Sequence, residues 1–296
     1  MSFQVDTALV HTYKSNIDIQ FQQKGSRLRP YVRVESQNAE FDFYDRIGSV
    51  YAVEVTGRHQ DTPLISTPHD RRRVGLRDFD WADLVDKKDK LRMLADPTSS
   101  YTQNAVFALG RKMDDTIIEA AFGVAYTGKT GATQVVFNTA FEVARDYVES
   151  GVAADSNLTI AKLRRTRFLL TKSDQLDDDM ELLYMAVTAS QIDSLLRTTE
   201  VTSSDYNSVK ALVAGTIDTF MGFKFIRLER LTKVSTLRSC IAWATGGLIL
   251  AVADEVNVDV GPRRDKRNST QIYVSGSFNA SRMWEEKVVR VYCVEA

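Results

Sequence analysis

The stretch YTQNAVFALGRKMDDTIIEAAFG, residues 101–123, has the clearest helical periodicity in the chain. Its apolar residues recur at spacings of three and four, which is the repeat of one helix face. They are Val106, Leu109, Met113, Ile117 and Ala120. The spacing predicts a helix of about 20 residues, about 30 Å long, from near Thr102 to Phe122, and Gly123 is suited to cap its C-terminal end.

The next stretch, GVAYTGKT at 123–130, matches the phosphate-loop pattern Gly-x-x-x-x-Gly-Lys-Thr. A phosphate loop follows a buried strand, and a helix whose N-terminus faces the phosphates follows the loop. Here the order is reversed, because a helix precedes the match and GATQVVFN, with Val135, Val136 and Phe137, favours a strand after it. We interpret the stretch as a glycine-rich turn and keep a phosphate-loop NTPase as an alternative.

The residues before the helix predict an arm followed by extended segments. The first 16 residues are weakly patterned, and we expect an arm that only a partner orders. Apolar and polar residues alternate in NIDIQFQQ, LRPYVRVES, EFDFYDRIGSVYAVEVTG and RRRVGLRDF. The last two of these runs flank GRHQDTPLISTPHD, which holds two of the five prolines, so they predict a long hairpin. DWADLVDKKDKLRML predicts a helix with Asp80 as its cap.

After the turn, helical and strand patterns alternate. Helices are predicted in LTIAKLRRTRFLLTKSD, in TASQIDSLL with Thr188 as cap, in SSDYNSVKALVAG with Ser204 or Asp205 as cap, and in GGLILAVA. Strands are predicted in ELLYMAV, FMGFKFIRLERL and CIAWA, and two long ones in NSTQIYVSGSFNASRMWEEKVVRVYCVEA. The mixture predicts an α+β fold with a discontinuous second domain.

The composition is that of a soluble globular protein. Of the 296 residues, 44% are apolar and 26% charged. The 38 basic and 39 acidic residues give a net charge of −1, which argues against a dedicated nucleic-acid binder. The N-terminus lacks the form of a signal peptide, and no apolar run approaches the ~20 residues of a membrane span. We therefore expect a cytoplasmic, soluble product.

The sequence offers few groups for catalysis or metal binding. Four acids fall within residues 174–179, but neighbouring residues cannot easily face one ion, so we expect a solvated loop. No nucleophile elbow, dinucleotide fingerprint or zinc motif occurs, and we expect no catalytic, cofactor or metal site. The remaining candidate metal ligands are Cys240, Cys293, His11, His59 and His69. None of them has a cysteine or histidine partner at the sequence spacing of a metal site. The two cysteines suit a reducing compartment.

Arginines cluster at 71–73, 163–167 and 263–267. Each cluster could meet phosphate or acids of a neighbouring subunit, and the balanced net charge favours the second. A free arm, a long Arg-rich hairpin and one long helix suit a subunit that wraps its neighbours.

The sequence resembles the tailed-bacteriophage major capsid proteins. ADPTSSYTQNAVFALGRKMDDTIIEAA resembles their long spine helix, and LTIAKLRRTRFLL, LLYMAV with TASQIDSLL, and VTSSDYNSVKALVAGTIDTFMGFKFIRLERL resemble their axial domain. GPRRDKRNSTQIYVSGSFNASRMWEEKVVRVYC resembles the closing strands of their peripheral domain. The resemblance runs from about residue 20 to the C-terminus and implies the Hong Kong-97 capsid fold. The implied parts are an N-terminal arm (1–40), an extended loop (41–80), a peripheral domain (81–154) with the spine helix at 102–122, an axial domain (155–250) and returning peripheral strands (251–296).

The implied function is structural rather than enzymatic. Copies would assemble as hexamers and pentamers into an icosahedral shell around double-stranded DNA, within the cytoplasm of a bacterial host. The implied partners are a separate scaffolding protein, a portal and, in some shells, a decoration or cement protein. On the extended loop we expect contacts with the next subunit through Arg71, Arg72, Arg73 and Arg77.

Some members of the family lock the shell by an isopeptide bond from a lysine of the extended loop. No lysine occurs from Gly25 to Asp86, so we expect a shell without covalent cross-links. An encapsulin-type compartment has the same fold and stays open as an alternative. A decoration or tail protein is a further alternative, which the long helix argues against.

Overall fold

The computed structural model describes residues 22–58, 61–86, 98–172, 182–197 and 219–295. The chain forms two compact units. The first comprises 1–26, 77–112 and 254–278, and the second comprises 27–76, 113–253 and 279–296. The predicted arm at 1–16 and the predicted helix at 203–215 lie outside the described residues. The five predicted domain boundaries stay predictions.

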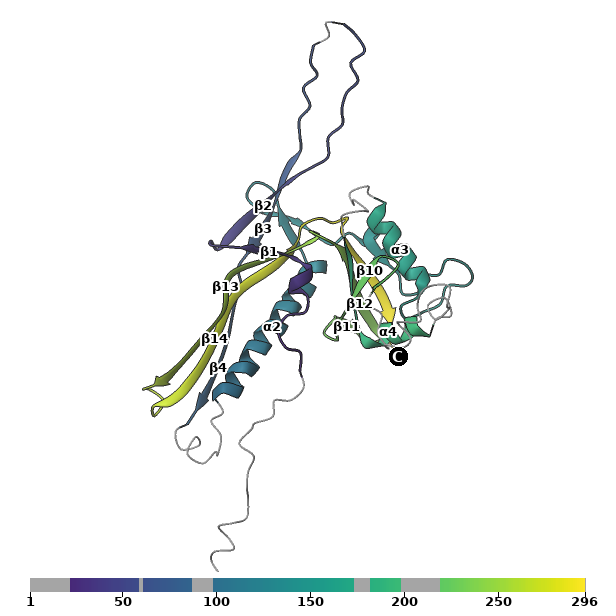
Figure 1. Ribbon diagram of the computed structural model, residues 1–296. Helices are drawn as coiled ribbons and strands as arrows, with labels where there is room; N and C mark the ends of the chain where they lie inside the picture. Colours follow the sequence, from purple (N-terminus) through teal and green to yellow (C-terminus); the bar gives the residue numbers. More distant parts are fainter. Residues whose placement is uncertain (1–21, 59–60, 87–97, 173–181, 198–218, 296) are drawn as a thin grey trace, which may run out of the picture. The chain divides into compact units, whose positions relative to one another are not determined.

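In the first unit, a helix lies along a sheet (Figure 1). The helix is α2, Thr98–Phe122, whose residues up to Lys112 belong to this unit. The strands are β4 (Asp78–Val85), β13 (Leu248–Arg263) and β14 (Ser269–Arg282). Between helix and sheet lies a core of Val85, Ala105, Leu109, Ile272 and Val274, against which Phe79 and Trp81 pack. The long helix predicted from the periodicity of 101–123 is confirmed.

The helix predicted from Asp80 is wrong in its first part. Residues 78–85 form strand β4, which pairs antiparallel with β14 from Asp78↔Ser277 to Val85↔Thr270. The physical reason is a two-residue repeat, since Phe79 and Trp81 pack on the core while Asp80 between them is exposed. The rest of the predicted helix falls at 87–94, outside the described residues.

The second unit contains a seven-stranded sheet among the described residues. Its strand order is β7 (Glu142–Val143), β15 (Val288–Val294), β12 (Leu237–Ala244), β8 (Leu183–Val187), β10 (Phe223–Arg227) and β9 (Thr219–Phe220), with β11 (Lys233–Val234) beside β12. Helix α3 (Ile160–Thr171) packs against β12 and β15. Helix α4 (Ala189–Leu196) follows β8, and its N-cap is Thr188 as predicted.

The helix predicted in GGLILAVA is also wrong. These residues begin strand β13, and Leu248 to Val252 are all buried. A continuous apolar run fits a strand covered on both faces as well as a short helix, so periodicity could not separate the two. Strand β1 (Arg33–Ser36), which follows the short helix η1 (Arg29–Tyr31), pairs in parallel with β13 here, from Arg33↔Ile249 to Ser36↔Val252.

A smaller sheet carries the hairpin. Its order is β2 (Phe41–Ile47), β3 (His69–Gly75), β5 (Ala125–Thr127) and β6 (Thr133–Val135), followed in sequence by the short helix η2 (Thr139–Phe141). Strands β2 and β3 pair from Phe41↔Gly75 to Ile47↔His69, so the predicted hairpin is confirmed. Beyond the strands, residues 48–58 and 61–68 form no strand and extend as a long loop (Figure 1).

The C-terminal end of β15 is tied to the start of α4 by Glu295, which is 6% exposed. Its carboxylate accepts hydrogen bonds from Thr188 Oγ1 at 2.7 Å, Gln191 Nε2 at 2.9 Å and Arg238 Nη2 at 2.9 Å, and Lys233 pairs with it at 3.1 Å. Burial alone would raise the pKa of Glu295, but these hydrogen bonds lower it to about 2.

We predict that Glu295 stabilises the fold above its unfolded pKa, near 4.5, and that this stabilisation is lost as the pH falls towards 2. Glu295→Gln should lower the free energy of unfolding by at most about 3 kcal/mol at pH 7, and by much less at pH 3. Urea unfolding of the unassembled chain at both pH values measures this. Glu149→Gln, at a side chain 42% exposed, is the control and should change stability by less than about 1 kcal/mol. An equal loss at both pH values would contradict the assignment.

Candidate assembly site at the base of the hairpin

The base of the hairpin is held by two buried arginines that share one carboxylate. Arg72 is 1% exposed and Arg282 is fully buried. Glu285 accepts from Arg72 through one oxygen, and from Arg282 Nε through the other at 2.5 Å. Arg282 Nη1 also donates to the carbonyl of Ala121 at 2.9 Å, near the C-terminal end of α2. Strand β3, the end of β14 and the end of α2 are therefore joined through Glu285.

A second charged group lies beside the first. Asp70 accepts hydrogen bonds from Arg46 and from Thr127 Oγ1, the latter at 2.6 Å. Arg46 Nη1 also donates to the carbonyl of Met283 at 2.6 Å. Burial alone would raise the pKa of Asp70, but the bonds from Thr127 and Arg46 lower it well below its usual value. Burial, followed by the nearby charge of Arg46, lowers the pKa of Arg72.

The literal phosphate-loop match, residues 123–130, comprises strand β5 and the start of the turn that joins β5 to β6. Strand β5 lies inside the match, and Gly131 N donates to Gly128 O at 3.0 Å. Both glycines have positive φ, 91° at Gly128 and 65° at Gly131, which side chains rarely adopt. A Cβ on Gly131 would lie 2.5 Å from Cδ of Arg73, whose guanidinium lies over the rings of Phe41 and Tyr126. The two glycines therefore serve the turn and its packing.

The surroundings of Lys129 do not suit a phosphate. It lines a cavity of about 390 Å³ together with Asp45, Asp70 and Arg71, and the two carboxylates balance the charges of Arg71 and Lys129, so the lining has no excess positive charge for a phosphate. Helix α2 precedes the turn, with Gly123 N donating to Glu119 O at 2.8 Å, and β6 follows it. The helix-before, strand-after order predicted from the sequence is confirmed.

The four arginines expected to contact a neighbour lie in different environments. Arg71 pairs with Asp45 at 3.2 Å and its side chain is 41% exposed. Arg77 is exposed, with its guanidinium 5.6 Å from the ring centre of Phe79. Arg73 is partly buried in its ring stack and Arg72 is used within its own chain. Their role in subunit contact stays a prediction.

Sequence reasoning missed Glu285, the partner of Arg72, and Arg282, which shares that carboxylate. Both belong to NASRMWEEKVVRVYC, which shows only that charged residues interrupt a strand pattern. Nothing in that pattern tells which distant strand they meet.

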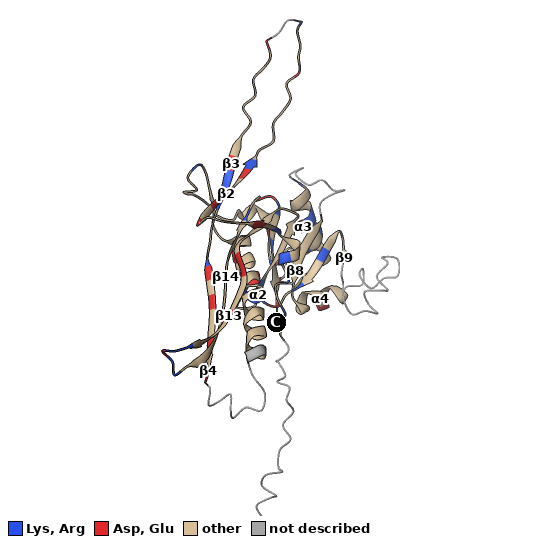
Figure 2. Ribbon diagram, turned by 60° about the vertical axis from the view of Figure 1, so that its left-hand side comes forward, with Lys and Arg blue, Asp and Glu red and all other residues tan. Residues whose placement is uncertain are grey.

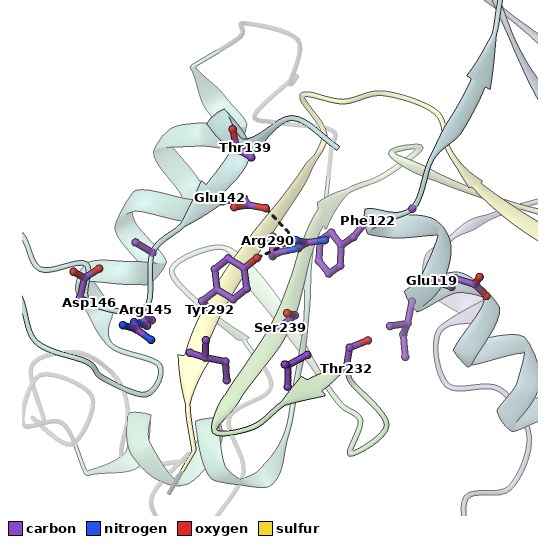
Figure 3. Close-up of a pocket in the computed structure, with 15 residues that line it drawn as sticks. Glu119, Phe122, Thr139, Glu142, Arg145, Asp146, Thr232, Ser239, Arg290 and Tyr292 are labelled. Atoms are coloured by element: carbon purple, nitrogen blue, oxygen red, sulfur yellow. Dashed lines mark hydrogen bonds and ion pairs between the residues drawn. The ribbon is translucent and has the colours of Figure 1, made fainter. Parts of the chain in front are cut away.

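A cavity of about 860 Å³ lies between the end of α2 and strands β7, β12 and β15 (Figure 3). Arg290 projects into it and pairs with Glu142 at 3.0 Å. Its guanidinium also lies 4.0 Å from the ring centre of Phe122 and 3.0 Å from Tyr292 Oη. The lining residues include no lysine, histidine or cysteine. The cavity therefore holds an ion pair against aromatic walls and no nucleophile with a base.

Cys240 and Cys293 are both fully buried, in the neighbouring strands β12 and β15. A hydrogen bond with Cys293 and burial raise the pKa of the Cys240 thiol well above its ordinary value, so it stays protonated and unreactive. No group of three or more metal-binding side chains occurs in the described parts of the chain. Among the helices that the structure describes, none is long and apolar enough to cross a membrane.

Comparisons with known proteins identify the fold. The family model described as phage capsid protein matches residues 5–295. The capsid structure of Helicobacter pylori bacteriophage KHP30 matches with a TM-score of 0.75 at 8% identity, covering 99% of this chain and 98% of that one. The capsid of cyanophage P-SCSP1u gives 0.74 at 11%, covering 98% and 94%, and Mycobacterium phage Che8 gives 0.69 at 14%, covering 96% of each. No curated protein matches the chain. The predicted α+β capsid fold is thereby confirmed.

Gly131→Ala should destabilise the unassembled chain by about 1–3 kcal/mol, because it places a side chain at positive φ against Arg73. Lys129→Ala, two residues away on the same turn, should change stability by less than about 0.5 kcal/mol. Urea unfolding of the two variants compares them directly. Equal effects would contradict the packing role of Gly131.

We predict no binding of ATP or GTP with magnesium, because the turn provides no helix N-terminus for the phosphates. Isothermal titration calorimetry of the full chain measures this, with Lys129→Ala as the matched variant. A micromolar affinity that Lys129→Ala abolishes would overturn the interpretation of GVAYTGKT as a turn.

Proposed function

The chain belongs to the phage capsid protein family and is a major capsid protein of an icosahedral shell, and we propose that its copies assemble as hexamers and pentamers, enclose double-stranded DNA and hold together without covalent cross-links. The protein then acts as a structural component and catalyses no reaction. Its shell assembles in the cytoplasm of the bacterial host and remains in the virion.

The observation that carries the assembly proposal is the loop at the end of the β2–β3 hairpin. Large apolar side chains along it face water, with Tyr51 84%, Val55 68% and Leu64 97% exposed. Burying one such side chain fully contributes about 1.5–3 kcal/mol. The loop has no core of its own to supply that burial, whereas a neighbouring copy can, and every copy in a shell repeats the contact.

The absence of reactive groups supports a non-covalent shell. No lysine occurs between Lys24 and Lys87, so the loop carries no amine for an isopeptide bond. Cys240 and Cys293 are both buried within the chain. Contacts through the loop and the arm, or a separate cement protein, then supply the cohesion.

The DNA is held without sequence preference, in keeping with a net charge of −1 on each copy. A separate scaffolding protein directs assembly and a portal admits the DNA. An encapsulin-type compartment, the second candidate, has the same fold and differs in its contents. Purified particles that contain a cargo enzyme and no DNA would favour it.

Boiled particles on a reducing denaturing gel should give a single band near 33.3 kDa. The loop has no amine that could form a bond to survive this treatment. A ladder of oligomers would show that a lysine elsewhere cross-links the shell. Finding only monomers, with and without the other virion proteins, would contradict assembly itself.

The hairpin arginines should divide into two classes. Arg71→Ser with Arg77→Ser should leave the free energy of unfolding within about 1 kcal/mol and lower the yield of particles. Arg72→Ser should lower the free energy of unfolding of the monomer by about 1.5–3 kcal/mol, because it removes one of the two charged hydrogen bonds to Glu285. Urea unfolding and particle yield by sedimentation separate the classes. Unchanged assembly of the Arg71/Arg77 variant would refute their contact role.

A further inference from the structure

The β13–β14 hairpin of the first unit ends in a cationic turn. The turn, residues 263–267, carries four cations and one acid, all exposed. The acid, Asp265, pairs with Arg263 at 3.0 Å, and the other cations are Arg264, Lys266 and Arg267. Figure 2 shows this turn in blue at the end of the two strands.

One face of the same sheet is acidic. Phe79, Trp81 and Val274 pack on the core, so alternation turns Asp78 and Asp80 to the opposite face. There Asp78 accepts from Ser277 Oγ at 2.6 Å and Asp80 from Tyr273 Oη at 2.8 Å. The outward positions of β4 and β14 carry no lysine or arginine; they are Asp78, Asp80, Ala82, Leu84, Gln271, Tyr273, Ser275 and Ser277. These eight residues are called the acidic face below.

Asp259 of β13 adds a third carboxylate on this side. Val256 packs against the core, and Asp259 is three positions further along the strand, so it points away from the core. Asp259 is exposed. This side of the sheet therefore carries three carboxylates, and the outward positions of β4 and β14 hold no cation. Its charge is opposite to that of the turn, which has an excess of cations.

The turn cannot reach Asp78 or Asp80 of its own chain, because its contact with the acidic face is at the near end, where Arg263 Nη1 donates to Gln271 Oε1 at 3.4 Å. Asp80 is paired with Ser275, which is six residues along β14 from Ser269, the first strand residue after the turn. At about 3.4 Å per residue, the strand separates the end of the turn from Asp80 by about 20 Å. Both belong to one hydrogen-bonded sheet, so the separation from Asp78 and Asp80 is fixed, and only another molecule can bring the turn against these two carboxylates.

We infer that the cationic turn of one copy docks on the acidic face of a second copy. The inference rests on the proposed shell and names a contact within it. Because turn and face are different surfaces, the contact is head-to-tail, which closes into rings when the rotation permits. DNA as the partner of the turn would leave the complementary acidic face unexplained, so a second copy accounts for more of the surface. Exposed charges contribute mainly to the rate and register of such a contact, and salt weakens it.

Zero-length cross-linking with a carbodiimide tests the contact directly. Lys266 is the one amine among the cations of the turn, and the reagent joins an amine to a carboxylate in contact with it. Particles assembled from an equal mixture of light and ¹⁵N-labelled chains should yield mixed-label peptides joining Lys266 to Asp78, Asp80 or Asp259. Lys266→Arg, which keeps the charge and removes the amine, should abolish these peptides. Their absence from the unsubstituted protein would overturn the inference, even where intact particles uphold the proposed function.

Charge reversal provides an independent test. Arg264→Glu with Lys266→Glu, and separately Asp78→Lys with Asp80→Lys, should each lower the initial rate of assembly about tenfold at low salt. Combining both pairs restores opposite charges and should recover most of the rate, which no general loss of folding would do. Unchanged rates in both reversed variants, or no recovery in the combined variant, would overturn the inference. Intact shells that lose only packaged DNA on reversal of the turn would assign the turn to nucleic acid instead.

Discussion

Glu285 and its two buried arginines are the constraint on which the hairpin depends. A buried guanidinium is costly unless a carboxylate and hydrogen-bond acceptors surround it. Arg72 and Arg282 share the carboxylate of Glu285, and Arg282 also donates to the carbonyl of Ala121, whereas Nη1 of Arg72 is buried without a hydrogen-bond partner. Removing Glu285 would leave two buried guanidiniums without a carboxylate, whereas removing either arginine leaves Glu285 paired with the other. The base of the hairpin is therefore fixed in direction, although the loop beyond it has no core.

A rigid base and an exposed apolar loop have complementary roles in a capsid protein. The role of the base is to fix the direction of the loop and to keep the loop away from the rest of its own chain. Tyr51 and Leu64 face water in the single chain, and the proposed assembly would cover them. The glycine-rich turn belongs to the same arrangement, because Gly131 makes room for Arg73 between Phe41 and Tyr126. A pattern that looks like a nucleotide site thus contributes to the support of the hairpin.

The sequence correctly predicted the helices and strands whose apolar residues recur at one clear spacing. It failed where the pattern fitted a helix as well as a strand. Helix α2 and the strands of the hairpin follow directly from the spacing of their apolar residues. Residues 80–85 were mistaken for a helix because Asp80 resembles a cap, and the start of β13 because LILAVA is apolar on every side. At the candidate site, the sequence pointed to the arginines of the hairpin. It could not predict which of them are buried or which residues they contact. Glu285 is more than 200 residues from Arg72, and no local pattern encodes a pairing at that separation.

Hydrogen–deuterium exchange, compared between the unassembled chain and the purified particle, tests the central claim most directly. The account predicts that the amides of β2 and β3 are protected in both states, because the base is a property of the single chain. Amides at 48–58, in the loop, should exchange freely in the unassembled chain and become protected only in the particle. Protection of the loop before assembly, or none after it, would contradict the account.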